Sequence, residues 1–286
     1  MTDESSKYAC VCASNSKKCK LKIEEIPKLK PNDVVIYETS KDSSERMKQI
    51  VLEDSIEEEV SPSWSTYVFD IDSEKKFQKI IGFGGALTDA TFLNLNSMGE
   101  EVKDEIFENY FGKSGIEYTL GRVPIGSTDF SQEVYSYCEK KDLSLESFSI
   151  GVDKGETTGF KLQNLKRVLE IVENRGSNMK LFASPWAPPA WMTDTGEVIH
   201  NPRLSVLKEI KKVYTEYLKK FFQEYQSEGV AFWGMTVQNE PDGNLGEWQS
   251  LRFSPEEYRD FVKEFLGPEL KTEFPDLKII MHDDQR

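Results

Sequence analysis

Asn239 and Glu240 end an apolar run, Phe232–Val237, and Pro241 follows them closely. A short apolar, β-branched run that stops in polar groups is typical of a buried parallel strand. Pro241 has no backbone N–H to donate, so the strand must stop there. An amide and a carboxyl would then lie at the carboxyl end of a strand, where a (β/α)₈ barrel carries its catalytic groups. A single glutamate at a strand end is more often only solvated, so the interpretation depends on the other strands.

Four other apolar runs also end in a charged or aromatic residue. These residues are Asp89, Arg122, Trp186 and Asp283. Strands that alternate with amphipathic helices predict a parallel sheet, either doubly wound or closed into a barrel. Functional groups at the end of every strand fit one ring-shaped mouth better than an open crevice. We therefore predict an α/β fold, a (β/α)₈ TIM barrel of which the first five β/α units are present.

The helices between these strands show apolar residues at spacings of three and four. One stripe runs from Leu162 to Val172 and ends before Gly176, and another runs from Val206 to Tyr225 and ends before Gly229. Each stripe indicates a helix with one buried face. Ser254–Glu257 has the pattern of a capping box with proline at the first helical position, which predicts the start of a further helix.

The N-terminal region, residues 1–76, has a different texture from residues 77–286. It contains three short strand-like runs separated by polar turns: Asp33–Thr39, Lys48–Glu53 and Thr66–Asp72. Such runs predict a small all-β region. We expect two domains with a boundary at residues 76 and 77, the second being the incomplete barrel.

Composition excludes several classes of function. The chain has 36 Lys and Arg against 50 Asp and Glu, a formal charge of −14, which disfavours nucleic acid and anionic membranes as partners. No stretch approaches the length of a transmembrane span. The two histidines, His200 and His282, are far apart, and Gly82–Gly85 lacks the spacing of a phosphate loop. We predict no metal site and no cofactor.

Three of the four cysteines crowd the N-terminus: Cys10, Cys12 and Cys19. In a loop-like segment this indicates disulfides and an oxidising compartment, while a zinc site is the alternative but lacks a nearby histidine. Met1–Glu4 is polar, so no signal peptide is visible, and we expect a trimmed or incomplete version of a secreted chain. Cys138 stands alone and is expected to be an unpaired surface or core thiol.

Six motifs occur in an order that matches one family of enzymes. They are Gly82–Ala90, Arg122–Pro124, Ser127–Ser131, Ala183–Trp191, Gln238–Pro241 and Asp283–Arg286. Together they make the chain resemble the acid β-glucocerebrosidase (lysosomal glucosylceramidase) family of retaining glycosidases, from about Tyr8 to the last residue. The resemblance implies that residues 1–76 belong to an accompanying β-domain and that Cys12 and Cys19 form a disulfide.

The resemblance also implies roles for six residues. Glu240 matches the general acid/base, and Asn239 matches the amide that hydrogen-bonds the sugar 2-hydroxyl. Four more match positions in or beside the glucose subsite: Arg122, Asp129, Phe130 and Trp186. A retaining glycosidase needs a protonated carboxyl and, about 5–5.5 Å away, a nucleophilic carboxylate. A glutamate in a partly apolar barrel mouth can have its pKa raised towards the acid role.

The resemblance implies hydrolysis of glucosylceramide to glucose and ceramide without metal or cofactor, in a lysosomal or secreted protein. A lipid-presenting activator protein would be a possible partner. The family's nucleophile lies on a later barrel strand, so residues 1–286 alone are expected to be inactive. Two alternatives are a retaining glycosidase for another β-glycoside and a catalytically dead sugar-binding fragment.

Overall fold

The computed structural model describes residues 27–41, 47–54, 72, 74–242 and 246–284. The chain divides into two compact units, residues 1–81 and residues 82–286. The predicted disulfide partners, Cys12 and Cys19, lie outside the described residues, as does nearly all of the predicted strand Thr66–Asp72.

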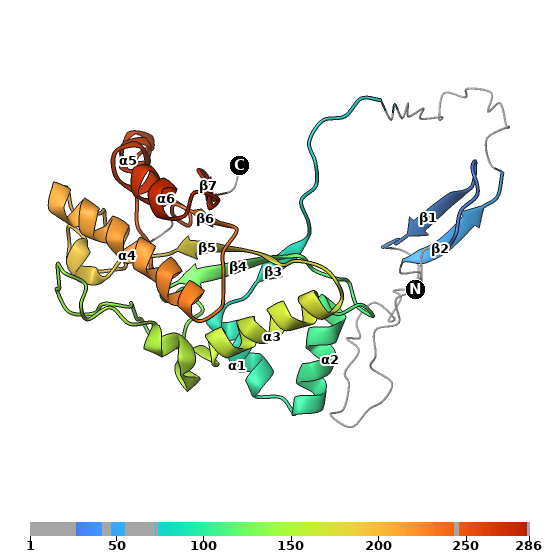
Figure 1. Cartoon of the computed structure of the whole chain (residues 1–286), viewed down its shortest axis with the longest axis horizontal. Coiled ribbons are helices and arrows are strands. Elements are labelled where there is room, and N and C mark those ends of the chain that lie inside the picture. Colours follow the sequence, from blue (N-terminus) through green and yellow to red (C-terminus); the bar gives the residue numbers. More distant parts are fainter. Residues whose placement is uncertain (1–26, 42–46, 55–71, 73, 243–245, 285–286) are drawn as a thin grey trace, which may run out of the picture. The chain divides into compact units, whose positions relative to one another are not determined.

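The first unit contains an antiparallel pair of strands, β1 (Val34–Glu38) and β2 (Lys48–Leu52) (Figure 1). Their register places Val34 opposite Leu52 and Glu38 opposite Lys48. Two of the three strands predicted in the N-terminal region are thereby confirmed. Alternate apolar side chains in such a pair normally face a core, yet Val34 and Val51 remain about two-fifths exposed, at 43% and 42%.

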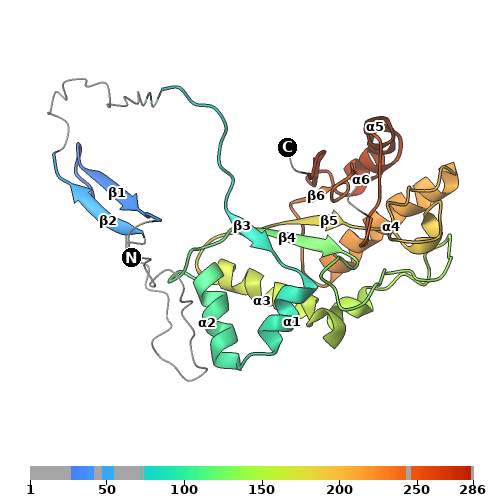
Figure 2. The same cartoon turned by 180° about the vertical axis from the view of Figure 1, so that it is seen from behind.

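The second unit is built on five parallel strands that follow one another in chain order (Figures 1 and 2). They are β3 (Gly84–Ala86), β4 (Leu120–Ile125), β5 (Lys180–Pro185), β6 (Gly234–Thr236) and β7 (Lys278–Ile280). The predicted alternation of strands and helices is confirmed, because each connection between neighbouring strands contains at least one helix. Parallel strands need such a crossover, since both carboxyl ends must lie at the same edge of the sheet.

Figure 1 shows α1–α3 beneath β3–β5, and α5 and α6 beside β6 and β7. The bounds of the helices are α1 (Asp89–Asn96), α2 (Glu100–Phe111), α3 (Lys161–Asn174), α4 (Lys208–Ser227), α5 (Pro255–Phe261) and α6 (Gly267–Glu273). A π-helical turn, Val262–Leu266, joins α5 to α6. Short 3₁₀ turns occur at Ile150–Lys154, Glu156–Thr158 and Ala190–Met192. No helix within the described ranges is both long and apolar enough to cross a membrane.

The predicted apolar faces of α3 and α4 are buried, with one exception. Leu165, Val168 and Phe221 are fully buried, whereas Val206 is 81% exposed. Val206 precedes α4, because Leu207 has extended backbone angles and serves as the N-cap. The inclusion of Val206 in the buried face was therefore wrong.

Two further sequence predictions in this unit are confirmed. The capping box of α5 is present, with Ser254 and Glu257 each bonding the other's backbone N–H. Cys138 is a free cysteine, and it lies buried in the core.

The glycine run before α1 serves packing between strands. A Cβ atom at Gly84 would lie 1.8 Å from the backbone oxygen of Leu120. No side chain fits at that distance, so glycine lets β3 approach the backbone of β4. This close approach gives the Gly82–Gly85 run a physical reason other than phosphate binding.

Candidate active site

The carboxyl ends of β4 to β7 bring four polar side chains together. Arg122 lies within β4, Ser184 lies near the end of β5, and Asn239 and Asp283 follow β6 and β7. Neighbouring strands are parallel and in register, so these positions lie at the same edge of the sheet. Three of the predicted strand-end residues, Arg122, Asn239 and Asp283, therefore do converge, although Arg122 lies inside β4 and not at its end.

Arg122 joins these groups through one guanidinium nitrogen. Its Nη2 donates to Asp283 Oδ2 at 2.7 Å, to Asn239 Oδ1 at 2.7 Å and to Ser184 Oγ at 3.0 Å. Ser184 Oγ in turn donates to Asp283 Oδ2 at 2.7 Å. Because Asn239 accepts from Arg122 through its oxygen, its NH₂ group is the part left to donate to a ligand. The network thus orients the amide as a donor, as a role at a sugar hydroxyl requires.

Trp186 lies against the same guanidinium. The Arg122 Cζ atom is 4.5 Å from the centre of the Trp186 ring, and the tryptophan is only 8% exposed. At this distance the positive charge is attracted to the face of the indole. Gln238 Nε2 donates to the Trp186 backbone oxygen at 2.7 Å, which ties the ends of β5 and β6 together. Arg122 and Trp186 are therefore in direct contact at this edge of the sheet.

Glu240 has an unusual backbone conformation, with φ at 45°. Residues other than glycine and asparagine seldom occupy this left-handed region, and its use at a carboxyl beside a polar network is typical of functional sites. The Glu240 N–H donates to the Asp283 backbone oxygen at 2.9 Å, which links the residue to the end of β7. This hydrogen bond therefore helps to hold Glu240 in its left-handed backbone conformation at the carboxyl ends of β6 and β7.

The environment of Glu240 favours its protonated form. Burial raises the pKa of Glu240 above its ordinary value, and the negative charges of Asp284 and Asp129 raise it further. The Arg122 charge acts in the opposite direction on the same pKa but does not outweigh them. A raised pKa suits a carboxyl that has to donate a proton to a leaving oxygen.

Asp129 and Phe130 lie on the segment that follows β4. Both side chains are exposed, Phe130 by 71%. The negative charge of Asp129 is one of the causes that raise the pKa of Glu240. Phe130 presents an apolar surface beside Asp129 and is the more exposed of the two predicted aromatic residues.

Two members of this group were not among the predicted site residues. Ser184 and Asp283 both contact Arg122. Asp283 carried a signal, because it ends an apolar run, whereas Ser184 is one small polar residue inside a strand. Asp89 was also predicted to end a strand, but it is the first residue of α1, is only 1% exposed, and its carboxyl bonds Lys161, Ser131 and Tyr135 instead.

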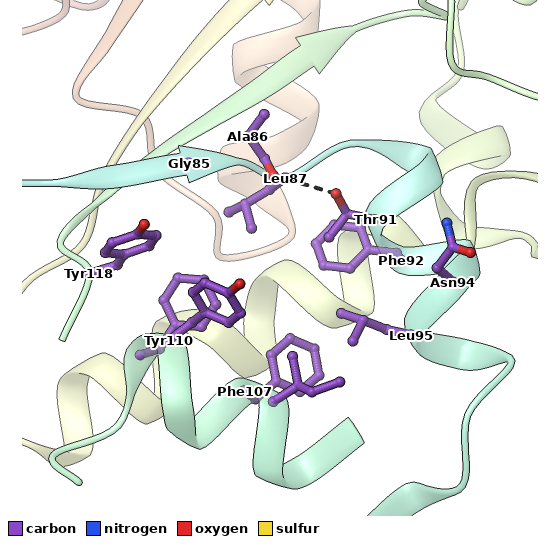
Figure 3. Close-up of a pocket in the computed structure, with 12 residues that line it drawn as sticks. Gly85, Ala86, Leu87, Thr91, Phe92, Asn94, Leu95, Phe107, Tyr110 and Tyr118 are labelled. Carbon is purple, nitrogen blue, oxygen red and sulfur yellow. Dashed lines mark hydrogen bonds between the residues drawn. The ribbon is translucent and has the colours of Figure 1, made fainter. Parts of the chain in front are cut away.

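A cavity of about 410 Å³ lies away from this site, between β3, α1 and α2. Figure 3 shows Leu87, Phe92, Leu95 and Phe107 pointing towards it. Its lining is mainly apolar and contains none of the residues predicted for the site. Among the residues that the structure describes, no three His, Cys, Asp or Glu side chains are grouped so that they could hold a metal ion.

Comparison with known proteins gives a consistent picture. The family described as "Glycosyl hydrolase family 30 TIM-barrel domain" matches this chain over residues 80–286. A Caenorhabditis elegans protein named "Putative glucosylceramidase 3" is 36% identical over 283 residues, covering 96% of this chain and 52% of that protein. The mouse lysosomal acid glucosylceramidase is 38% identical over 221 residues, 74% of this chain and 41% of that protein.

Among solved structures, the endo-β1,6-glucanase BT3312 superposes with a TM-score of 0.70 at 29% identity, covering 86% of this chain and 51% of that chain. This chain spans about half the length of the curated relatives named above. The five parallel strands described here are accordingly part of a TIM barrel. From the match over residues 80–286, the chain belongs to glycosyl hydrolase family 30.

Proposed function

We propose that this protein is a retaining β-glucosidase of the glucosylceramidase type, which hydrolyses glucosylceramide to glucose and ceramide. The observation that carries the proposal is the raised pKa of Glu240 next to the Arg122 network. The mouse relative's name points to the same substrate class and to the lysosome. A lipid-presenting activator protein would suit a substrate whose ceramide part is buried in a membrane.

In the proposed first step, Glu240 donates its proton to the glycosidic oxygen as ceramide leaves. A second carboxylate attacks the sugar carbon from the opposite side and forms a glycosyl ester. In the second step, Glu240, now a carboxylate, takes a proton from water while that water attacks the ester and releases glucose. Asn239 would hold the sugar 2-hydroxyl through its NH₂ group, and Trp186 would offer an apolar face to sugar C–H groups.

The aglycone distinguishes this proposal from a second candidate. A Trichoderma harzianum endo-1,6-β-D-glucanase is 27% identical over 238 residues, so another β-glycoside is a possible substrate of the same site. We would compare hydrolysis of glucosylceramide in detergent micelles with hydrolysis of a β-1,6-glucan, using the protein at its full natural length. Faster turnover of the glucan would reject glucosylceramide as the substrate.

The polypeptide of residues 1–286 is expected to show no glucosidase activity. The carboxylate inside the Arg122 network, Asp283, is already engaged, because it accepts from Arg122 and from Ser184 at 2.7 Å each. We propose that the nucleophile comes from a later strand of the eight-stranded barrel. A fluorogenic β-glucoside assay of residues 1–286 beside Glu240→Gln tests this. Hydrolysis above that of the variant would contradict it and would make Asp129 the next candidate nucleophile.

Asp284→Asn should move the alkaline limb of the activity profile to lower pH. The negative charge of Asp284 raises the pKa of Glu240, so its removal lets that pKa fall. Glu240 must be protonated in the first step, and activity is lost as pH rises through its pKa. The pH dependence of kcat/KM measures the shift. Asp276→Asn, an exposed position before β7, is the matched control. Equal profiles for both variants would contradict the proposed acid role.

A further inference from the structure

The segment after β4, residues 126–137, carries Asp129 in a closed turn. We call this segment the β4 loop. The Thr128 N–H donates to Ser131 Oγ at 3.0 Å, and the Ser131 N–H donates to the backbone oxygen of Thr128 at 3.1 Å. Further along, the Tyr135 N–H donates to Ser127 Oγ at 3.1 Å, and the Ser127 N–H donates to the Tyr135 oxygen at 3.2 Å. Asp129 therefore lies at the tip of a hydrogen-bonded turn.

A buried group of charges lies beneath this loop. Lys161 Nζ is 2.8 Å from Asp153 Oδ1 and 3.2 Å from Asp89 Oδ1, and none of the three residues is more than 1% exposed. We call these three residues the lysine cluster. They come from α3, from the 3₁₀ turn Ile150–Lys154 and from the first position of α1. Charges are found so deeply buried only when they are paired and hydrogen-bonded.

Tyrosine hydroxyls complete the hydrogen bonding of the lysine cluster. Tyr137 and Tyr225 donate to Asp153 Oδ2 at 2.7 Å and 2.6 Å. Burial, followed by the charge of Asp153, raises the pKa of both tyrosines well above the ordinary range, so their hydroxyls stay protonated. Burial by itself would lower the pKa of Lys161, but the carboxylates outweigh it and raise that pKa. The cluster thus keeps a fixed set of donors and acceptors.

Ser131 connects the β4 loop to the lysine cluster. Its hydroxyl donates to Asp89 Oδ2 at 2.6 Å while it accepts from the Thr128 N–H at 3.0 Å. Tyr135 makes a second connection, because its hydroxyl donates to Asp89 Oδ2 at 2.8 Å and accepts from Lys161 Nζ at 3.1 Å. A continuous path of hydrogen bonds therefore runs from the residue directly before Asp129 to a fully buried lysine.

We propose that Ser131 is a positioning residue, which fixes the turn that carries Asp129 against the buried carboxylate of Asp89. This inference rests on the proposed function together with the role that the family resemblance implies for Asp129, a position in or beside the glucose subsite. Both Asp129 and Phe130 are exposed, so burial of their own side chains does not hold them in place. The Ser131 hydroxyl supplies that restraint through its hydrogen bond to the Asp89 carboxylate, and hydrogen bonds to charged groups are stronger than those between neutral groups.

The test compares four variants of the protein at its full natural length: Ser131→Ala, Ser131→Thr, Asp129→Asn and Ser144→Ala. Ser144 is the matched control, because its hydroxyl donates to Asp142 Oδ1 at 2.6 Å but lies in a different, exposed turn. Measured quantities are kcat/KM for a fluorogenic β-glucoside, hydrogen exchange at the Thr128 amide, and the melting temperature.

Ser131→Ala should lower kcat/KM by about tenfold to a hundredfold, because misplacing a binding group by about 1 Å has effects of that size. Exchange at the Thr128 amide should rise by about tenfold, since its acceptor is removed. Ser131→Thr keeps the hydroxyl and should restore both quantities, and Ser144→Ala should change neither.

The outcomes separate this inference from the proposed function. If Asp129→Asn leaves kcat/KM unchanged, the proposed role of Asp129 is wrong and the inference loses its basis. If Asp129→Asn lowers kcat/KM but Ser131→Ala alters neither kcat/KM nor Thr128 exchange, the inference is wrong and the proposed function stands. If Ser131→Ala lowered the melting temperature and Ser131→Thr did not restore it, Ser131 would have a general structural role. That result would also overturn the inference.

Discussion

Glu240→Gln lowers the turnover of β-glucosides with poor leaving groups by about 10²–10⁴-fold, the range typical of lost acid catalysis. This is the largest effect expected of any substitution at the site. Glutamine keeps the size of the side chain and can still form hydrogen bonds, but it cannot donate the proton that the departing oxygen needs. The measurement is kcat/KM for glucosylceramide and for a series of aryl β-glucosides in the protein at its full natural length.

The leaving group and an external nucleophile make the Glu240 prediction specific. Activated aryl glucosides need little acid assistance, so the first step should suffer less with them. Azide should rescue the second step, because as an anion it attacks the glycosyl ester without a general base. Glu247→Gln, an exposed glutamate on the segment after β6, is the matched control and should behave as the parent protein. Uniform loss on all substrates without rescue by azide would indicate a structural role for Glu240.

Lys161→Met lowers the free energy of unfolding by about 3–5 kcal/mol, the cost of leaving buried charges without their partner. Methionine fills a similar volume but leaves the carboxylates of Asp89 and Asp153 without a positive charge. Both carboxylates are buried, and water cannot replace the ammonium group. Urea denaturation followed by tryptophan fluorescence gives the change in unfolding free energy.

Lys154→Met provides the matched control for this prediction. Lys154 also forms an ion pair, with Glu228, but its side chain is 48% exposed. Exposed pairs contribute about 0–1 kcal/mol, so the control should lose little stability. If both variants lost the same free energy of unfolding, burial of the lysine cluster would not be the reason for its contribution to stability. A change in the denaturant slope would point to an altered unfolded state.

The strand ends were predictable from sequence because each one breaks an apolar run. Arg122, Trp186 and Asn239 stand where such runs meet polar residues, and the structure brings these three together. The parallel arrangement follows from the alternation of strand and helix, since consecutive parallel strands end at one edge of the sheet. The order of elements was therefore sufficient for the main part of the site.

Asp89 shows what the order of elements could not provide. Like Arg122, it was predicted to end a strand, but it is the first residue of α1 and contacts Lys161 and Ser131 instead of the Arg122 network. A signal was present in the sequence, because Lys161 precedes Leu165 and Val168 at helical spacing and so shares their buried face. A lysine on a buried face requires an acidic partner, but the sequence does not say which carboxylate supplies it.

The predicted start of α4 was wrong, because the sequence pattern does not fix where the helix begins. Val206 has the right spacing to extend the apolar face that begins at Ile210. Periodicity identifies a face but not the residue at which the backbone becomes helical, and Leu207 is extended. The sequence did not identify Ser184 as a site residue, because a serine inside a buried strand usually has no functional role. Its contact with Arg122 arises only from the pairing of β4 with β5.

The order of strands in the sheet bears on how the protein is made at the ribosome. Spatial order equals chain order from β3 to β7, so each new strand pairs with the one synthesised just before it. Parallel pairing is slow when a long stretch of chain must first be closed into a loop, and here each closure spans only one helical crossover. The sheet can therefore grow one unit at a time during translation, with each newly emerged strand covering the edge left by its predecessor.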